Sequence, residues 1–126
     1  MSYTIRQASE KSGFSTHTLR YYEKEGILPS IRRDKNGNRF FNDEDIEWLS
    51  FVKCLKDTGM SVQNIKRYVQ LFQEGEHTTT ERKNMLIEHK QKIEAQIEDI
   101  KQFHEKITLK IEHYGKCCKL ADKIRK

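Results

Sequence analysis

The first 26 residues carry the pattern of two short helices joined by a glycine turn. Small and apolar residues recur at helical spacing from Ile5 to Ser12, and Gly13 follows as a helix stop. Residues 16–24 then form a second helical segment, in which Leu19 and Tyr22 are expected to face inward. A small residue at the crossing, a glycine in the turn and an aliphatic anchor on the second helix are typical of a helix-turn-helix.

A β-hairpin is predicted next. Pro29, the only proline of the chain, ends helix formation, and strands are expected near residues 30–34 and 39–41. Asn36 and Gly37 between them predict a type I′ turn, because both residues tolerate a positive φ. A hairpin that carries arginines and follows a helix-turn-helix is the plan of a winged helix.

Two more helices are delimited by capping residues. Asn42 can cap a third helix that ends at Gly59, and Ser61 a fourth that ends at Gly75. The inward positions expected on the fourth helix are Val62, Ile65, Tyr68, Val69 and Phe72.

From Thr78, where a capping box with Glu81 is expected, apolar residues recur at alternating steps of three and four. This seam consists of Leu86, Ile93, Ile97, Ile100, His104, Ile107, Ile111 and Tyr114, with Lys90 between the first two. A lone helix cannot cover such a stripe, and only 12 residues follow Tyr114. We therefore expect a coiled-coil homodimer, in which Lys90 and His104 set the register or leave the seam locally wet.

These elements predict a mainly all-α chain in three parts. Residues 1–75 form a winged helix-turn-helix domain with its helix-turn-helix motif at about 4–23. Residues 78–114 form the dimerisation helix, and residues 115–126 a short basic tail.

Composition and charge narrow the class of protein. Apolar residues make up 35% of the 126 residues and charged residues 34%, which suits small helical units with solvated faces. With no signal peptide, no apolar run of the ~20 residues that span a membrane, and three cysteines, we expect a cytoplasmic protein without disulfides or membrane contact. Residues 1–42 carry eight Lys and Arg against four Asp and Glu, a net charge of +4 that suggests a polyanionic partner.

The second helix carries candidate DNA contacts near its N-terminal half. The residues expected to face outward there are Thr16, His17, Arg20 and Tyr21. Arginine bonds bidentately to guanine or phosphate, and the hydroxyls suit phosphate oxygens. Taken alone, these residues fit a solvated surface equally well. Combined with the basic hairpin of Arg32 and Arg33 and a dimer helix, they favour binding of double-stranded DNA at a pseudo-palindromic operator.

The N-terminal part of the sequence resembles a known family. The strings "TIRQASEKSGFSTHTLRYYEKEGILP", "GNRFF" and "DIEWLSFVKCLKDTGMS" are similar to the DNA-binding domain of MerR-family transcriptional regulators, over residues 3 to about 75, and the long helix continues the likeness to about 114. Phe41 stands where the family usually has tyrosine.

The resemblance implies a set of DNA contacts and a mode of action. Arg20 and Tyr21 would touch DNA, Arg39 and Lys56 would hold phosphate, and Tyr22 would be shared between core and DNA backbone. Family members bend and untwist promoters with overlong spacers, so that RNA polymerase meets realigned promoter elements.

The effector stays open between three hypotheses. The resemblance is closest to the aldehyde- and thiol-stress-responsive branch, in which a cysteine placed like Cys54 is the proposed sensor. Lys53 and Lys56, within one helical turn, would favour its thiolate, although a buried inert cysteine fits the same position. The chain after the seam is too short to enclose an organic ligand, so a small signal is expected.

A metal sensor is the second hypothesis, and its candidate ligands are His113, Cys117 and Cys118. The third is an architectural DNA binder without effector. No cofactor is expected, and no catalytic constellation that would indicate an enzyme stands in the sequence.

Overall fold

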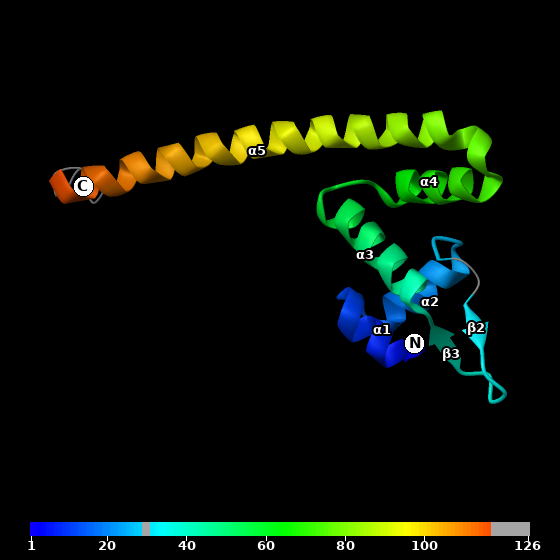
Figure 1. Cartoon of the computed structure of the whole chain (residues 1–126). Coiled ribbons are helices and arrows are strands. Elements are labelled where there is room, and N and C mark those ends of the chain that lie inside the picture. Colours follow the sequence, from blue (N-terminus) through cyan, green and yellow to red (C-terminus); the bar gives the residue numbers. More distant parts are fainter. Residues whose placement is uncertain (29–30, 117–126) are drawn as a thin grey trace. The chain divides into compact units, whose positions relative to one another are not determined.

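The computed structural model describes residues 1–28 and 31–116 (Figure 1). Its helices and strands follow in the order β1 (Tyr3–Thr4), α1 (Ile5–Ser12), α2 (Thr16–Lys24), β2 (Arg32–Arg33), β3 (Arg39–Phe41), α3 (Asp43–Asp57), α4 (Val62–Glu74), a 3-10 turn η1 (Glu76–Thr78) and α5 (Thr79–Lys116). The chain forms two compact units, Met1–Leu86 and the part that begins at Ile87. The predicted class, mainly helical with a small wing and a long last helix, is confirmed.

Capping side chains set the ends of the helix-turn-helix. The hydroxyl of Thr4 accepts a hydrogen bond from the Gln7 amide at 3.1 Å, and the Gln7 side chain accepts from the Thr4 amide at 2.9 Å. Gly13 ends α1 with a φ of +82°, in the left-handed region that favours glycine. Ser15 then caps α2 by accepting from the Thr18 amide at 3.0 Å. The predicted motif is confirmed.

The wing differs from the prediction in its turn. Arg33 pairs with Arg39, and Asp34 donates its amide to the Asn38 carbonyl at 2.9 Å, so the loop holds three residues instead of two. Only Gly37 in that loop has a positive φ, and the expected type I′ turn at Asn36–Gly37 is therefore wrong. The Asp34 carboxylate accounts for the difference, because it accepts the amides of Asn36 and Asn38 and favours the longer loop.

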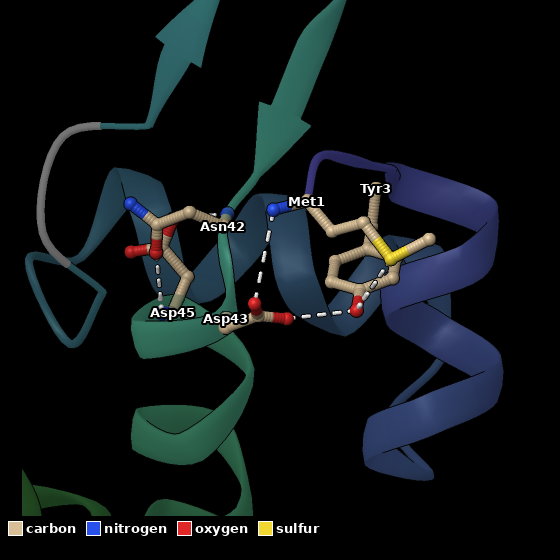
Figure 2. A network of polar contacts seen from close by, with 5 residues as sticks. All are labelled: Met1, Tyr3, Asn42, Asp43 and Asp45. Carbon is tan, nitrogen blue, oxygen red and sulfur yellow. Dashed lines mark hydrogen bonds and ion pairs between the residues drawn. The ribbon is translucent and has the colours of Figure 1, made fainter.

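A strand that sequence reasoning missed completes the sheet. β1 pairs antiparallel with β3, Tyr3 opposite Phe41, and the strand order is β1-β3-β2. Figure 2 shows the polar contacts beside this pair: the Tyr3 hydroxyl donates to the Asp43 carboxylate at 2.7 Å, and the N-terminal ammonium lies 3.8 Å from the same carboxylate. Asn42 and Asp45 form the capping box that begins α3. The N-terminus is thereby tied to the third helix.

The core lies among α1, α2, α3, α4 and the segment after α2. Its largest fully buried side chains are Phe41, Leu19, Ile27, Leu28, Leu49, Ile65, Val52 and Val69. The indole N–H of Trp48 donates to the Ile27 carbonyl at 3.1 Å and joins α3 to that segment. Val62 and Phe72 are exposed, contrary to prediction, whereas Leu71 is buried and its carbonyl accepts a hydrogen bond from the Thr78 hydroxyl.

The start of α5 also departs from prediction. Thr78 is buried, and its hydroxyl lies within hydrogen-bond distance of the carbonyls of Leu71 (2.6 Å) and Gly75 (2.7 Å). Arg82 Nε donates to the same hydroxyl at 3.0 Å, while Glu81 lies 3.6 Å from Arg67. The expected capping box of Thr78 and Glu81 is wrong, because η1 takes Thr78 into the junction with α4.

Candidate nucleic-acid interface

One face of α2 is exposed and the other is packed in the core. His17, Arg20 and Tyr21 are exposed, and Thr16 is half-buried at the start of the helix. Tyr22 is only 3% exposed, so its ring belongs to the core and not to the surface that the other residues share. The outward set predicted from sequence is therefore brought together on one surface, with Tyr22 behind it.

Tyr22 packs against Phe14, and two lysines of α3 lie over the Phe14 ring. The rings of Tyr22 and Phe14 meet edge to face, with centroids 5.1 Å apart. Burial, with smaller contributions from Tyr21 and Asp57, raises the pKa of Tyr22 above its usual value. The ammonium groups of Lys53 and Lys56 lie 5.1 and 5.5 Å from the centre of the Phe14 ring. Lys56 is thus held beside the turn between α1 and α2.

The wing arginines are held by an acidic residue of α2. Arg39 Nε donates to Glu23 Oε1 at 2.7 Å, and an Arg33 terminal nitrogen lies 3.6 Å from the same oxygen. Arg33 also donates to the Gly37 carbonyl at 3.0 Å, across its own loop. Arg32 is exposed. Two of the three wing arginines are therefore fixed relative to the end of α2.

Residues of α2 and of the wing line one surface hollow. It encloses about 420 Å³, and residues of β1, α1, α2 and the hairpin loop line it. Arg20 and Arg39 both face it, beside Tyr3, Asn38 and one acid, Asp34. The structure thus gathers arginines from the second helix and the wing, which lie 19 positions apart in the sequence, around one concave surface.

Two family models match this chain. The one described as MerR HTH family regulatory protein matches residues 3–71, which contain the helix-turn-helix and the wing. A second, described as MerR, DNA binding, matches residues 46–108. The chain belongs to the MerR family of DNA-binding transcriptional regulators.

Relatives of known sequence and structure agree with this assignment. An uncharacterised HTH-type transcriptional regulator of Haemophilus influenzae is 41% identical over 116 residues, 92% of this chain and 86% of the relative. The regulator AdhR of Bacillus subtilis is 38% identical over 89 residues, 71% of this chain and 64% of the relative. The crystal structure of HiNmlR, described as a MerR family regulator lacking the sensor domain and bound to promoter DNA, is similar with a TM-score of 0.85 and 41% identity over 92% of each chain. These MerR relatives are regulators and not enzymes.

Cys54 of this MerR-family chain is exposed on α3. The two lysines expected to act on its thiol are engaged elsewhere: both ammonium groups lie over the Phe14 ring, and Lys53 also pairs with Asp57 at 3.5 Å. The Cys54 carbonyl accepts a hydrogen bond from the Thr58 hydroxyl at 2.6 Å. The position is open to small reagents, but its cationic neighbours face the α1–α2 turn.

The seam residues lie along α5, and most of their side chains are exposed in the single chain. Ile100 is 65% exposed, and Ile97, Ile107, Ile111 and Tyr114 are comparably exposed. His104 and Lys90 are exposed as well, whereas Ile93 is half-buried. Leu86, the first seam residue, belongs to the first unit and packs partly against its core.

The candidate metal ligands are separated by the limit of the described chain. His113 is exposed on α5, while Cys117 and Cys118 lie outside the described residues. Within residues 1–28 and 31–116, no group of three His, Cys, Asp or Glu side chains is placed to hold a metal ion. In the same part of the chain, no helix is long and apolar enough to cross a membrane.

Sequence reasoning missed two residues of this surface. In the sequence Glu23 is only one of the four acids of residues 1–42, and its contact with the wing arginines depends on how the hairpin packs against α2. The sequence places Lys53 only as a neighbour of Cys54. Its place over Phe14, next to Lys56, depends on how α3 packs against the helix-turn-helix.

Proposed function

We propose that this MerR-family chain binds double-stranded promoter DNA as a homodimer and controls transcription by RNA polymerase at the same promoter. The observation that carries the proposal is the concave surface that Arg20 of α2 and Arg39 of the wing both line. HiNmlR, the similar structure, is described as bound to promoter DNA.

Within this proposal, each element has a distinct role. The exposed face of α2, with His17, Arg20 and Tyr21, enters the major groove, and Thr16 contacts phosphate at its start. The wing and α3 hold the DNA backbone through Arg32, Arg33, Arg39, Lys53 and Lys56. Tyr22, being buried, reaches phosphate through its hydroxyl at most. Phosphate contacts fix the register, and the α2 side chains read base edges.

The exposed stripe of α5 supports the homodimer. A helix of 38 residues is about 57 Å long at 1.5 Å per residue, and isoleucines recur along one side of it. Burying an isoleucine contributes roughly 1.5–3 kcal/mol, which a second copy of the same helix supplies along the whole seam. The two-fold axis gives the operator two half-sites, and the dimer acts on the promoter by bending and untwisting the DNA between them.

The finer part of the proposal assigns the signal to Cys54. Its thiolate adds to the carbonyl carbon of an aldehyde or to a ring carbon of a quinone. A carbon–sulfur bond forms, the C=O or C=C π bond breaks, and the displaced electron pair moves to oxygen, which takes up the proton lost by the thiol, so no separate oxidant is needed. The exposure of Cys54 supports this assignment. α3 runs from the wing to α4, so an adduct on α3 can change how the wing is presented to DNA.

Selection from a random pool of 30-bp duplexes tests the DNA-binding part. We expect the native protein to enrich a pseudo-palindrome, and Arg20→Ala to weaken its binding by about 1–3 kcal/mol. Lys83→Ala removes the same charge from an exposed site at the start of α5 and serves as the control. Equal binding by the native and Arg20→Ala proteins would show that α2 does not read the operator.

A further inference from the structure

Glu23 has an unusual position for an acid in a DNA-binding surface. Its side chain is 16% exposed, and both carboxylate oxygens are used. Oε1 accepts from Arg39 Nε at 2.7 Å and lies 3.6 Å from Arg33, while Oε2 accepts from the Ile31 amide at 3.2 Å. One carboxylate therefore joins α2 to the residue before the wing and to both wing strands.

The register of the wing explains why a carboxylate is needed there. Arg33 and Arg39 are directly opposite each other across β2 and β3. Like charges at such a cross-strand pair repel and destabilise the hairpin. Glu23 offsets this repulsion because its Oε1 lies close to both guanidinium groups, and because it belongs to α2, it also sets the distance between the wing and the second helix.

We infer that Glu23 is a positioning residue that makes MerR-type binding by this chain selective: it holds Arg33 and Arg39 in register with α2 and prevents them from taking phosphates of arbitrary DNA. The inference rests on the proposed function. The Glu23–Arg39 contact uses Nε, so the two terminal nitrogens of that guanidinium are not consumed by it. We call the contacts of Glu23 with Arg33 and Arg39 the clamp. When operator phosphates lie where the clamped Arg39 side chain points, the protein binds them without rearranging that side chain. Other DNA must break the clamp first.

Loss of the clamp should therefore raise affinity for the wrong DNA. Each additional phosphate neutralised on duplex DNA steepens the dependence of log K on log salt by about 0.9, which at about 0.1 M salt corresponds to roughly tenfold in affinity. With Glu23→Gln, we expect the slope for a scrambled 30-bp duplex to steepen by about 1 to 2. Affinity for the duplex selected by the native protein should not rise in parallel, so the ratio of the two dissociation constants should fall by about tenfold to a hundredfold.

Two further variants separate positioning from net charge. Glu25→Gln removes the same charge from the other side of the α2 end, where Glu25 pairs with Lys66 at 3.2 Å, and its slope should stay close to native. Glu23→Asp keeps the charge but is one methylene too short for the same contacts, and we expect it to steepen the slope without any change in net charge. Thermal unfolding by circular dichroism checks that each variant is folded.

Fluorescence anisotropy measures the dissociation constants for both duplexes between about 50 and 200 mM salt, roughly the range over which such contacts are resolved. The possible outcomes are distinct. Equal steepening by Glu23→Gln and Glu25→Gln would attribute the effect to net charge and overturn the inference. Weaker binding to both duplexes with an unchanged slope would reduce Glu23 to a structural residue, and would overturn it too. If the native protein enriches no duplex, the proposed function fails, but the scrambled-duplex slopes still decide whether Glu23 restrains the arginines.

Discussion

The hydroxyl of Tyr3 donates a hydrogen bond to the carboxylate of Asp43 at 2.7 Å, and so joins the first strand to the first turn of α3 (Figure 2). This bond, followed by burial and the charge of Asp43, raises the pKa of Tyr3 above its ordinary value. A raised pKa means that folding favours the neutral phenol. Its stabilisation is complete below about pH 10 and is lost as the pH rises through the folded-state pKa.

Tyr3→Phe should therefore flatten the alkaline part of the stability curve. We expect native protein to lose unfolding free energy above about pH 10, and the variant to lose less of it. Tyr22, whose pKa is also raised, remains in both proteins, so some decline persists. Urea unfolding followed by circular dichroism from pH 7 to 11.5 (about the useful range) measures this. Tyr21→Phe, on the exposed face of α2, is the control, and parallel curves for native and Tyr3→Phe would contradict the expectation.

The turn between α1 and α2 gives a second expectation. Gly13 has a φ of +82°, and a Cβ there would lie 3.3 Å from the Lys53 side chain that covers Phe14. Gly13→Ala should lower the unfolding free energy by about 1–2 kcal/mol through backbone strain, and Gly13→Asn by less, because asparagine tolerates this region. Gly26→Ala is the control for backbone strain without a close contact. Gly26 has a φ of +79°, and a Cβ there would have no described heavy atom within 4 Å. An Ala variant as stable as native would mean that residue 13 is not left-handed in solution.

The exposed stripe of α5 gives a third expectation. Replacing Ile97 and Ile100 with asparagine should convert a dimer to a monomer, because each buried isoleucine contributes roughly 1.5–3 kcal/mol to the interface. Sedimentation velocity at micromolar concentration measures the species. Leu109 is 56% exposed but lies on the opposite side of the helix from the stripe, so Leu109→Asn should remain dimeric. A persistent dimer of the Ile97 and Ile100 variant would place the interface elsewhere.

Local signals made most of the fold predictable from the sequence. Capping by Ser15 and Asn42 depends on residues three positions apart, and α2 begins at the predicted residue. The missed strand β1 pairs Tyr3 with Phe41, 38 positions away, and two residues carry no pattern of their own. The turn of the wing was missed because Asp34 competes with the Asn36–Gly37 signal by binding two amides.

The candidate site was predictable in its residue types but not in its connections. The outward face of α2 follows from helical periodicity, and Arg20 and Tyr21 are exposed as expected. That Glu23 joins both wing strands could not be read, because Arg39 is 16 positions away and the contact depends on the packing of the wing. The direction of the Lys56 ammonium, toward Phe14, depends likewise on how α3 crosses the helix-turn-helix.

The exposed thiol of Cys54 gives the last expectation. In a background with Cys117→Ser and Cys118→Ser, N-ethylmaleimide should label Cys54 in the folded protein, as measured by mass spectrometry of the intact chain. The adduct should change affinity for the selected duplex by about tenfold or more if α3 transmits it to the wing. Cys54→Ser should bind that duplex within about twofold of native and should not respond to the reagent, because a hydroxyl is not a comparable nucleophile.

A buried thiol two residues away provides the matched control. Val52 lies on the same helix and is 1% exposed. In the background without Cys117 and Cys118, Val52→Cys combined with Cys54→Ser therefore places one thiol in the core. This thiol is only two residues from position 54 along α3. We expect labelling of that thiol to be at least tenfold slower, since reagent access then requires local opening of α3. If both thiols react equally fast, exposure does not distinguish Cys54. If Cys54 reacts and DNA binding is unchanged, its thiol is accessible but is not the switch.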